Sequence, residues 1–508
     1  MRPFRIISLL AFTLVALLDL RQGSCFAQHD GDDIVIGTYR TMHSRVLDED
    51  RLLFVHLPRE YNDTQLRYPV LYLLYVDLSD YFTDAITVTE KLGGTGEMPP
   101  VIIIGVANTN RYRDLLPAKS RFNAESGGAG NFLRFIEEEL IPYIDNNYRT
   151  VDFHILVGPQ AAAVFSLYAL IEKPELFDAV ISENPFMNPE NAEFLYPRAE
   201  QFLKTTKPMK HLLYIRCEKN ERPQNLAYAE RFSRLLDSEN PQGLRFKVEF
   251  SEPSGYFTPP PPLKEGLRTL FAGHQLPPDF QSNSLQDILH YYERRSEEYG
   301  FKVVPPDHML TSEGVKLNQK GKAAEAVEVF EYQRTLYPRS LNALLQLGET
   351  YRGMGEFEKA RDFYRKFLEI RDRDAAMIHR RIEQIGRMID SSAAYRIEQE
   401  IRKSGIKSAV NMFWKVKSDS SNRLYFAENE FNAMGYRLMG AGNMEAALEI
   451  FKLNVELYPK SANVYDSLGE AYLKLGDNEN ASTNYRKSLE LNPENNNAKE
   501  ALRRLEKK

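Results

Sequence analysis

The stretch ILVGPQAAAVFSLYAL, residues 155–170, decides the fold of the first half of the chain. The run that leads into it, over 151–157, has the β-branched and apolar residues of a strand. A run with apolar residues at helical spacing begins almost at once, at Ala162. Only a short turn around Gln160 separates the two runs. We therefore predict a strand, a tight turn and a helix in direct succession.

Similar apolar runs recur on both sides of this turn, with helical patterns between them. Apolarity without alternation indicates parallel strands that are covered on both faces. Strands that alternate with helices predict a doubly wound α/β sheet. The expected strands lie within 33–57, which holds two segments, and at 69–75, 101–106, 153–158, 179–182, 211–217 and 244–250; the clearest helices lie at 130–148, 225–236 and 263–271.

The order of these motifs resembles the esterase family of α/β-hydrolases that includes enterochelin-type esterases. The resemblance covers about residues 33–272. It implies an α/β-hydrolase sheet in which the turn carries a serine nucleophile in the pattern G-x-S-x-G. The matching stretches are RYPVLYLLYVD, IIIGVANTNRYRDLLP, GGAGNFLRFIEEELIPYIDNNYRT, the turn with FSLYAL after it, KPELFDAVI and KEGLRTLF.

The nucleophile and base that the resemblance implies are both replaced. Gln160 stands at the nucleophile position, and an amide cannot form an acyl intermediate. The family's histidine base corresponds to Ser254, and no histidine occurs between His211 and His274. Ser166 lies further along the expected helix, where a hydroxyl packs or caps rather than attacks. General-base catalysis therefore has no imidazole to carry it.

The acid and the oxyanion hole are less clearly marked. Glu218 and Glu221 follow the strand after which the family places its acid, so they are the acid candidates. Tyr75 and Val76 replace the Asp-Gly pair that the family usually has after the strand at 69–75. Two alanines at 162–163 replace paired glycines, and their side chains crowd a position where the backbone must approach closely.

These replacements predict an esterase fold with a degenerate active site, a pseudo-hydrolase whose cleft binds a small ligand. The alternative is an active carboxylic-ester hydrolase with an unusual constellation, in which Ser254 or Ser166 works with Glu218 or Glu221. No cofactor and no metal site are expected. The residues predicted to line the cleft are Tyr75, Val76, Asp77 and Arg111, and Arg113 and Asp114 either flank it or form structural ion pairs.

A 34-residue period marks the second half of the chain. A glycine, an alanine, an aromatic residue and a proline or aspartate recur in order, and the pattern resembles the tetratricopeptide repeat, which implies an all-α solenoid. The small residues let two helices approach, and the aromatic ring fills the gap. The four copies are Gly314, Ala326, Phe330 and Pro338; Gly348, Ala360, Tyr364 and Asp372; Gly435, Ala447, Phe451 and Pro459; and Gly469, Ala481, Tyr485 and Pro493.

Arrays of this kind bind a protein or peptide partner on their concave face. Residues 375–427, which contain the single tryptophan Trp414, are helical in pattern and represent either a degenerate repeat or a hinge. A third hypothesis is a repeat adaptor in which the α/β half only anchors or solubilises the chain. The concave-face candidates are Asn342, Glu349, Arg352, Asn463, Asp466 and Glu470.

Composition and the first residues indicate the compartment. The chain has 508 residues, a formal charge of −6 and no basic patch, so nucleic acid is not an expected partner. Arg2 and Arg5 precede an apolar run over 6–18 that is too short to span a bilayer, as in a secretory signal. A lipid anchor on Cys25 is less favoured, because the residues before it lack leucine. We expect export to the periplasm or beyond, no transmembrane helix in the mature chain, and a buried Cys217.

The predicted organisation has six segments. They are a signal peptide over 1–27, an α/β-hydrolase domain over 28–274, a linker over 275–306, repeats one and two over 307–374, a helical spacer over 375–427, and repeats three and four with a capping helix over 428–508.

Overall fold

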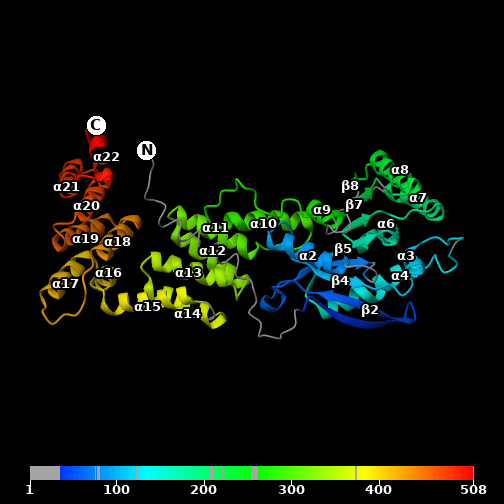
Figure 1. Cartoon of the computed structure of the whole chain (residues 1–508), viewed down its shortest axis with the longest axis horizontal. Helices are drawn as coiled ribbons and strands as arrows, with labels where there is room; N and C mark the ends of the chain where they lie inside the picture. The colour runs from blue at the N-terminus through cyan, green and yellow to red at the C-terminus, as the bar shows by residue number, and fades with distance from the viewer. Residues whose placement is uncertain are drawn as a thin grey trace.

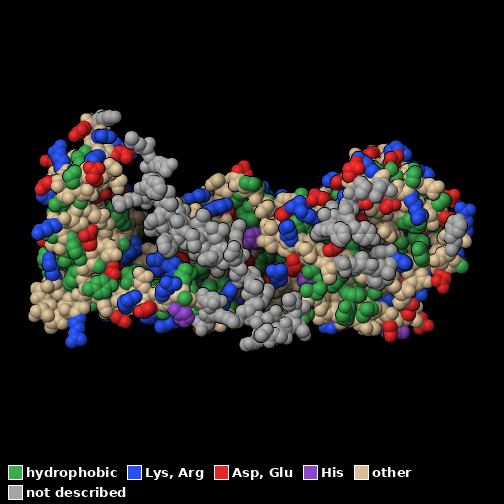
Figure 2. All heavy atoms as spheres, in the orientation of Figure 1, with side chains coloured by type: hydrophobic (Ala, Val, Ile, Leu, Met, Phe, Trp, Pro, Cys, Tyr) green, Lys and Arg blue, Asp and Glu red, His purple; other side chains and the backbone are tan. Residues whose placement is uncertain are grey.

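The computed structural model describes residues 35–74, 76, 81–121, 123–204, 211–219, 221–252, 261–371 and 375–506. The molecule is elongated: the α/β domain forms one end, and helices extend from it to the other end (Figure 1). Acidic and basic side chains are interspersed over the face that Figure 2 shows. Among the described residues, no helix combines the length and the apolar character that a bilayer crossing requires.

The α/β half contains an eight-stranded sheet with the strand order β1-β2-β4-β3-β5-β6-β7-β8. β1 and β2 pair in antiparallel fashion, β2 joins β4 in the same sense, and the strands from β4 to β8 run parallel. This confirms the predicted α/β-hydrolase sheet. The strands are β1 (Thr38–Ser44), β2 (Glu49–His56), β3 (Tyr68–Leu74), β4 (Ile102–Val106), β5 (Thr150–Pro159), β6 (Ala179–Glu183), β7 (His211–Glu218) and β8 (Leu244–Ser251).

Helices cover both faces of this sheet, as the apolar strands require. The predicted helix over 130–148 is interrupted by a π-helical turn, Ile136–Leu140, that separates α4 from α5. Cys217 is buried, as predicted, and burial raises the pKa of its thiol to about 12. On one face lie α2 (Tyr81–Gly94) and α9 (Pro261–Leu270); on the other lie α3 (Arg111–Leu115), α4 (Ala129–Phe135), α5 (Ile141–Asn147), α6 (Ala161–Glu172), α7 (Pro189–Leu203) and α8 (Pro223–Glu239).

The segment that joins the two halves is packed rather than free. It contains the helix α10 (Leu285–Tyr299), which begins at a capping box formed by Ser284 and Asp287. Aromatic rings link it to the sheet: Phe153 of β5 lies 4.8 Å from Phe301, measured between ring centroids. One hydrophobic cluster therefore runs from the α2/α9 face of the sheet through α10 and into the first repeats.

The repeat helices form pairs whose closest approach explains the 34-residue period. A Cβ built on Gly348 would lie 2.4 Å from the Tyr364 ring, and one on Gly314 would lie 2.3 Å from the Phe330 ring. Gly435 and Gly469 face aromatic rings in the same way. The helices are α11 (Asp307–Gln319), α12 (Ala323–Leu336), α13 (Leu341–Gly353), α14 (Phe357–Ile370), α18 (Glu428–Gly440), α19 (Met444–Leu457), α20 (Ala462–Lys474), α21 (Asn478–Leu491) and α22 (Asn496–Leu505).

Three helices occupy the predicted spacer: α15 (Ala376–Ser391), α16 (Ala393–Ser404) and α17 (Ile406–Ser418). The helix α15 belongs to the hydrophobic cluster of the first repeats, whereas α16 and α17 share a second cluster with α18 and α19. Polar contacts cross this break, because Arg402 of α16 binds Glu356 and donates to the Met354 carbonyl at 2.9 Å. The packing of α16 and α17 as a pair favours the degenerate-repeat interpretation.

Substitution of Gly348 tests the helix contact that sets the repeat. Gly348→Ala should lower the free energy of unfolding by about 1–3 kcal/mol, because its methyl group collides with a buried ring. Gly353→Ala, at the end of the same helix with open space around it, should be neutral or stabilising by up to about 1 kcal/mol. Urea unfolding of both variants measures the difference; equal effects would contradict this account.

Candidate functional site

The predicted turn is present, and its backbone is strained. Gln160 has φ 53° and ψ −112°, a backbone conformation that residues other than glycine rarely adopt. Its N–H donates to the Glu183 carbonyl at 2.8 Å, and its own carbonyl accepts from the Phe186 N–H at 3.1 Å. A Cβ on Gly158 would lie 2.4 Å from the Ala162 carbonyl oxygen, so only glycine fits there. The turn has the sharp shape of a nucleophile elbow.

The side chain at the tip of this elbow is the exposed amide of Gln160. Ser166, one of the alternative nucleophiles, is fully buried in α6 and donates to the Ala163 carbonyl at 2.9 Å. The alternative that uses Ser166 is therefore wrong, because a hydroxyl bonded inside a helix does not reach a substrate. Ser254, the other alternative and the family's base position, lies outside the described residues.

The described histidines are held away from the elbow. His154 of β5 is packed, with its ring against Tyr72 and its Nδ1 3.3 Å from the Leu176 carbonyl. His211 stands at the amino end of β7, the end opposite to the elbow. The others contact groups elsewhere: His43 with Asp50, His56 with Glu90, His274 with the Gly96 carbonyl, His290 with Glu293, His308 against Gly96, and His379 within α15.

The two acid candidates lie where the strand pattern placed them, at and just after the end of β7. The backbone N–H of Glu218 donates to Oδ1 of Asn184 at 2.8 Å, and the carboxylate of Glu221 accepts from Asn225 at 3.3 Å. Among the predicted cleft residues, Val76 is buried against Gly105, and the guanidinium of Arg111 lies over the Tyr112 ring. Tyr75 and Asp77 lie outside the described residues.

Arg113 and Asp114 have a structural role. The fully buried Arg51 of β2 donates to Asp114 at 2.7 Å, and Arg113 donates to the other oxygen of that carboxylate at 2.9 Å. Arg113 also binds Glu49 at 2.6 Å. This network fastens α3 to the edge of the sheet, so the ion-pair interpretation of Arg113 and Asp114 is confirmed.

A buried charged cluster beside the elbow was missing from the sequence analysis. Glu183 ends β6 with 5% of its surface exposed, and Arg216 of β7 has 7% exposed. Pro159 pairs with Glu183 and Glu183 with Arg216 across the sheet, so the cluster lies directly next to Gln160. Its sequence signal is a charged residue within or at the end of an apolar strand, in AVISE and LLYIRCE.

The polar atoms of this cluster are incompletely bonded. Arg216 donates from Nε to the Ser251 hydroxyl at 2.7 Å, but its Nη1 and the Glu183 Oε1 are buried without a hydrogen-bond partner in the described structure. Burial raises the pKa of Glu183 to about 7, against the opposing effects of Tyr81 and Arg216. The arrangement can exchange hydrogen bonds and a proton with a ligand, but it supplies no nucleophile.

The concave-face candidates do not converge on one site. Most of them bond to neighbouring helices: Glu349 accepts from Tyr364 at 2.8 Å, Asp466 from Asn495 at 2.8 Å, and Glu470 from Tyr436 at 3.0 Å. Asn463 donates to Glu428 at 3.1 Å, Arg352 pairs with Glu349 at 2.9 Å, and Asn342 is half-buried at the start of α13. These contacts position adjacent repeats, so the residues carry a structural role whether or not a partner also touches them.

Fold and elbow together define an α/β-hydrolase of the esterase type that is followed by tetratricopeptide repeats. Comparison with known families agrees: residues 44–248 match the family described as "Putative esterase", and residues 341–374 and 462–495 match the tetratricopeptide repeat. The chain therefore carries an enterochelin-esterase-like α/β-hydrolase domain and a repeat region.

Individual relatives point the same way. The chain is 30% identical over 187 residues to the ferri-bacillibactin esterase BesA of Bacillus subtilis (strain 168), covering 32% of this chain and 58% of that protein. It is 28% identical over 150 residues to the uncharacterized protein YjcH of the same organism, covering 28% and 60%. An IroE-like serine hydrolase structure from Shewanella oneidensis has 27% identity and a TM-score of 0.50, covering 59% of this chain and 99% of that one. The chain thus spans about three fifths of the curated relatives.

Replacement of Gln160 by glycine tests the strain in the elbow. Gln160→Gly should raise the free energy of unfolding by about 1 kcal/mol, because relief of the strained backbone exceeds the entropy that glycine adds to the unfolded chain. Gln160→Ala, which keeps the strain, should change little. Urea unfolding compares the two, and a glycine variant less stable than the alanine variant would show that the turn is not strained.

Stability as a function of pH tests the buried carboxyl. The pKa of Glu183 is about 7 in the folded chain against an ordinary 4.5, so the folded state holds the proton more tightly. Wild-type stability should therefore fall as the pH rises from about 5 to 8, and Glu183→Gln should remove on the order of 2–3 kcal/mol of that decline. Glu249→Gln is the control, because the Tyr214 hydroxyl lowers the pKa of Glu249 below its ordinary 4.5. Its contribution to stability is therefore constant between pH 5 and 8 and falls only at lower pH. Parallel pH profiles of wild type and Glu183→Gln would contradict the assignment.

Proposed function

We propose that this protein is a non-hydrolytic member of its esterase group, which binds an ester-type ligand at the elbow and a protein partner on its repeats. The observation that carries the proposal is the amide of Gln160 at the tip of an intact elbow. Loss of the nucleophile alone reduces serine-hydrolase turnover by about 10⁶-fold. Under this proposal the elbow is a polar binding site without a nucleophile.

The ligand class follows from the relatives and from the cluster beside the elbow. BesA is by name an esterase of ferri-bacillibactin. We infer that the elbow site of this chain takes a ligand of the same kind, a siderophore ester, and holds it without cleavage. The incompletely bonded Glu183 and Arg216 supply one acceptor and one donor for its polar groups.

The repeats give the protein its second function. Tetratricopeptide repeats indicate a protein partner, and this region is attached to the α/β domain through a shared hydrophobic core. We place the protein after export, in the periplasm or outside the cell, on the signal-like pattern of residues 1–27. A partner captured by the repeats would then keep the bound ligand at a defined place.

A fluorophosphonate probe tests the absence of a nucleophile. The wild-type chain should neither take up the probe nor hydrolyse p-nitrophenyl acetate or butyrate above buffer, because no hydroxyl stands on the elbow. Gln160→Ser should restore probe labelling weakly. The double change Gln160→Ser with Ser254→His should restore more, because a serine needs an imidazole to take its proton. Mass spectrometry of the labelled peptide locates the adduct.

Labelling of the wild-type chain on any side chain near the elbow would overturn the proposal in favour of an active hydrolase with an unusual constellation. Binding of ferric bacillibactin, followed by tyrosine fluorescence, tests the ligand separately. Saturable binding that weakens in Glu183→Ala supports the assignment, and the absence of binding to a folded chain refutes it.

A further inference from the structure

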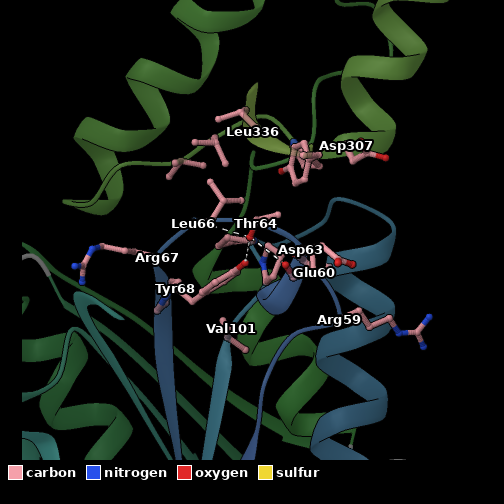
Figure 3. A pocket seen from close by; sticks show the side chains of 18 of the residues that line it. Arg59, Glu60, Asp63, Thr64, Leu66, Arg67, Tyr68, Val101, Asp307 and Leu336 are labelled. Carbon is pink, nitrogen blue, oxygen red and sulfur yellow. Dashed lines mark hydrogen bonds between the residues drawn. The ribbon is translucent and has the colours of Figure 1, made fainter. Parts of the chain in front are cut away.

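A second site lies at the opposite end of the parallel strands, away from Gln160. A cavity of about 570 Å³ opens beside the first residues of β3, β4 and β5, where the α/β domain meets the first repeat (Figure 3). One wall comes from residues 59–69, the end of α2 and 99–101; the other comes from 301–308 and 336–340. A cavity of this size at a domain junction is of the kind that holds a small molecule.

Apolar and aromatic groups form most of the lining. Leu66 and Val101 belong to one wall, and Leu336 and Phe301 to the other. The hydroxyls of the two lining tyrosines are already bonded: Tyr68 lies 2.7 Å from the Thr64 hydroxyl, and Tyr337 donates to the Pro305 carbonyl at 3.1 Å. These tyrosines therefore offer a ligand their rings rather than their hydroxyls.

Acidic and basic side chains are equal in number in the lining: Glu60, Asp63, Glu90 and Asp307 stand against Arg59, Arg67, Lys302 and Arg339. Glu60 is half-buried and has no ion-pair partner among the described residues. Burial raises the pKa of its carboxyl, and the carboxylates of Glu90 and Asp307 raise it further, with Arg59 in opposition. A second anion would be repelled at this position, whereas a cation would relieve the unfavourable field.

The basic residues of the lining do not neutralise Glu60. Arg59 binds Glu90 at 2.7 Å, and Arg339 binds Asp63 at 3.2 Å, an ion pair that ties one wall to the other. Figure 3 shows the guanidinium groups of Arg59 and Arg67 directed away from the space between the walls. Arg67 donates to the Thr150 carbonyl at 3.2 Å. Lys302 is exposed, and no ion pair joins it to Glu60 among the described residues. Glu60 is therefore left without a cationic partner.

We propose that this cavity binds an organic cation, an amine or quaternary ammonium carried on an apolar body. Glu60 pairs with the cationic group, and the rings of Tyr68, Tyr337 and Phe301 supply cation–π attraction and apolar contact. The ligand touches both walls, so it bridges the α/β domain and the first repeat. The site is separate from the elbow and does not depend on the function proposed there.

Calorimetric titration of the full chain with benzyltrimethylammonium tests this site. Saturable binding with one site per chain is expected, with benzyl alcohol and benzoate each at least about tenfold weaker, because neither can pair with Glu60. Glu60→Gln should weaken binding of the cation about tenfold, whereas Glu230→Gln, an exposed carboxylate of α8, should leave it unchanged. Leu336→Trp, which fills the cavity, should weaken all three probes.

Three results would overturn the proposal: no saturable binding of the cation at millimolar concentration, equal affinity for benzoate, or full affinity in a folded Glu60→Gln chain. Gln160→Ser serves as a further control. This substitution alters the elbow at the other end of β5 and should leave binding of the cation unchanged. The proposals for the cavity and for the elbow can therefore be tested independently.

Discussion

Burial of the second face of the parallel sheet is the constraint on which the rest of the structure depends. Parallel strands are apolar on both sides and must be covered on both. Of the helices that the structure describes, α3 to α8 cover one face and α2 and α9 cover the other, and the cluster of α2 and α9 continues through α10 into the first repeats. The first repeats consequently share a hydrophobic core with the α/β half. A separately expressed half would expose apolar surface that the full chain buries. Binding of a partner should therefore be measured with the full chain.

The local features of the fold could be predicted from the sequence because they depend on short spacing. The strand–turn–helix around Gln160 and the glycine–aromatic contacts of the repeats each arise from residues close in sequence. The elbow could be located because Gly158 leaves room for a turn that any Cβ at this position would block.

The features that sequence could not predict depend on register and on distant contacts. Glu183 and Arg216 become neighbours of Gln160 only because β5, β6 and β7 pair in one particular register. The cavity that Glu60 lines is built from residues near 60, near 300 and near 340, and no short-range sequence pattern connects these segments. The sequence likewise does not show that Glu349 and Asp466, two of the predicted concave-face residues, bond to Tyr364 and Asn495.

The strained turn favours a site that has kept a binding function over a site that has lost all function. A backbone at φ 53° on a residue with a side chain costs on the order of 1–3 kcal/mol, a sizeable fraction of a domain's net stability. The sheet does not need that conformation, because the loop over 107–110, which joins β4 to α3 in the same layer, contains no residue with a positive φ. Two hydrogen bonds, to Glu183 and from Phe186, hold the turn in place, and the first of these ends on the residue that also carries the unpaired buried carboxyl. Strain and an unsatisfied polar atom at the same point are typical of a functional site. Under the non-hydrolytic function that we propose, binding of a ligand is what these features serve.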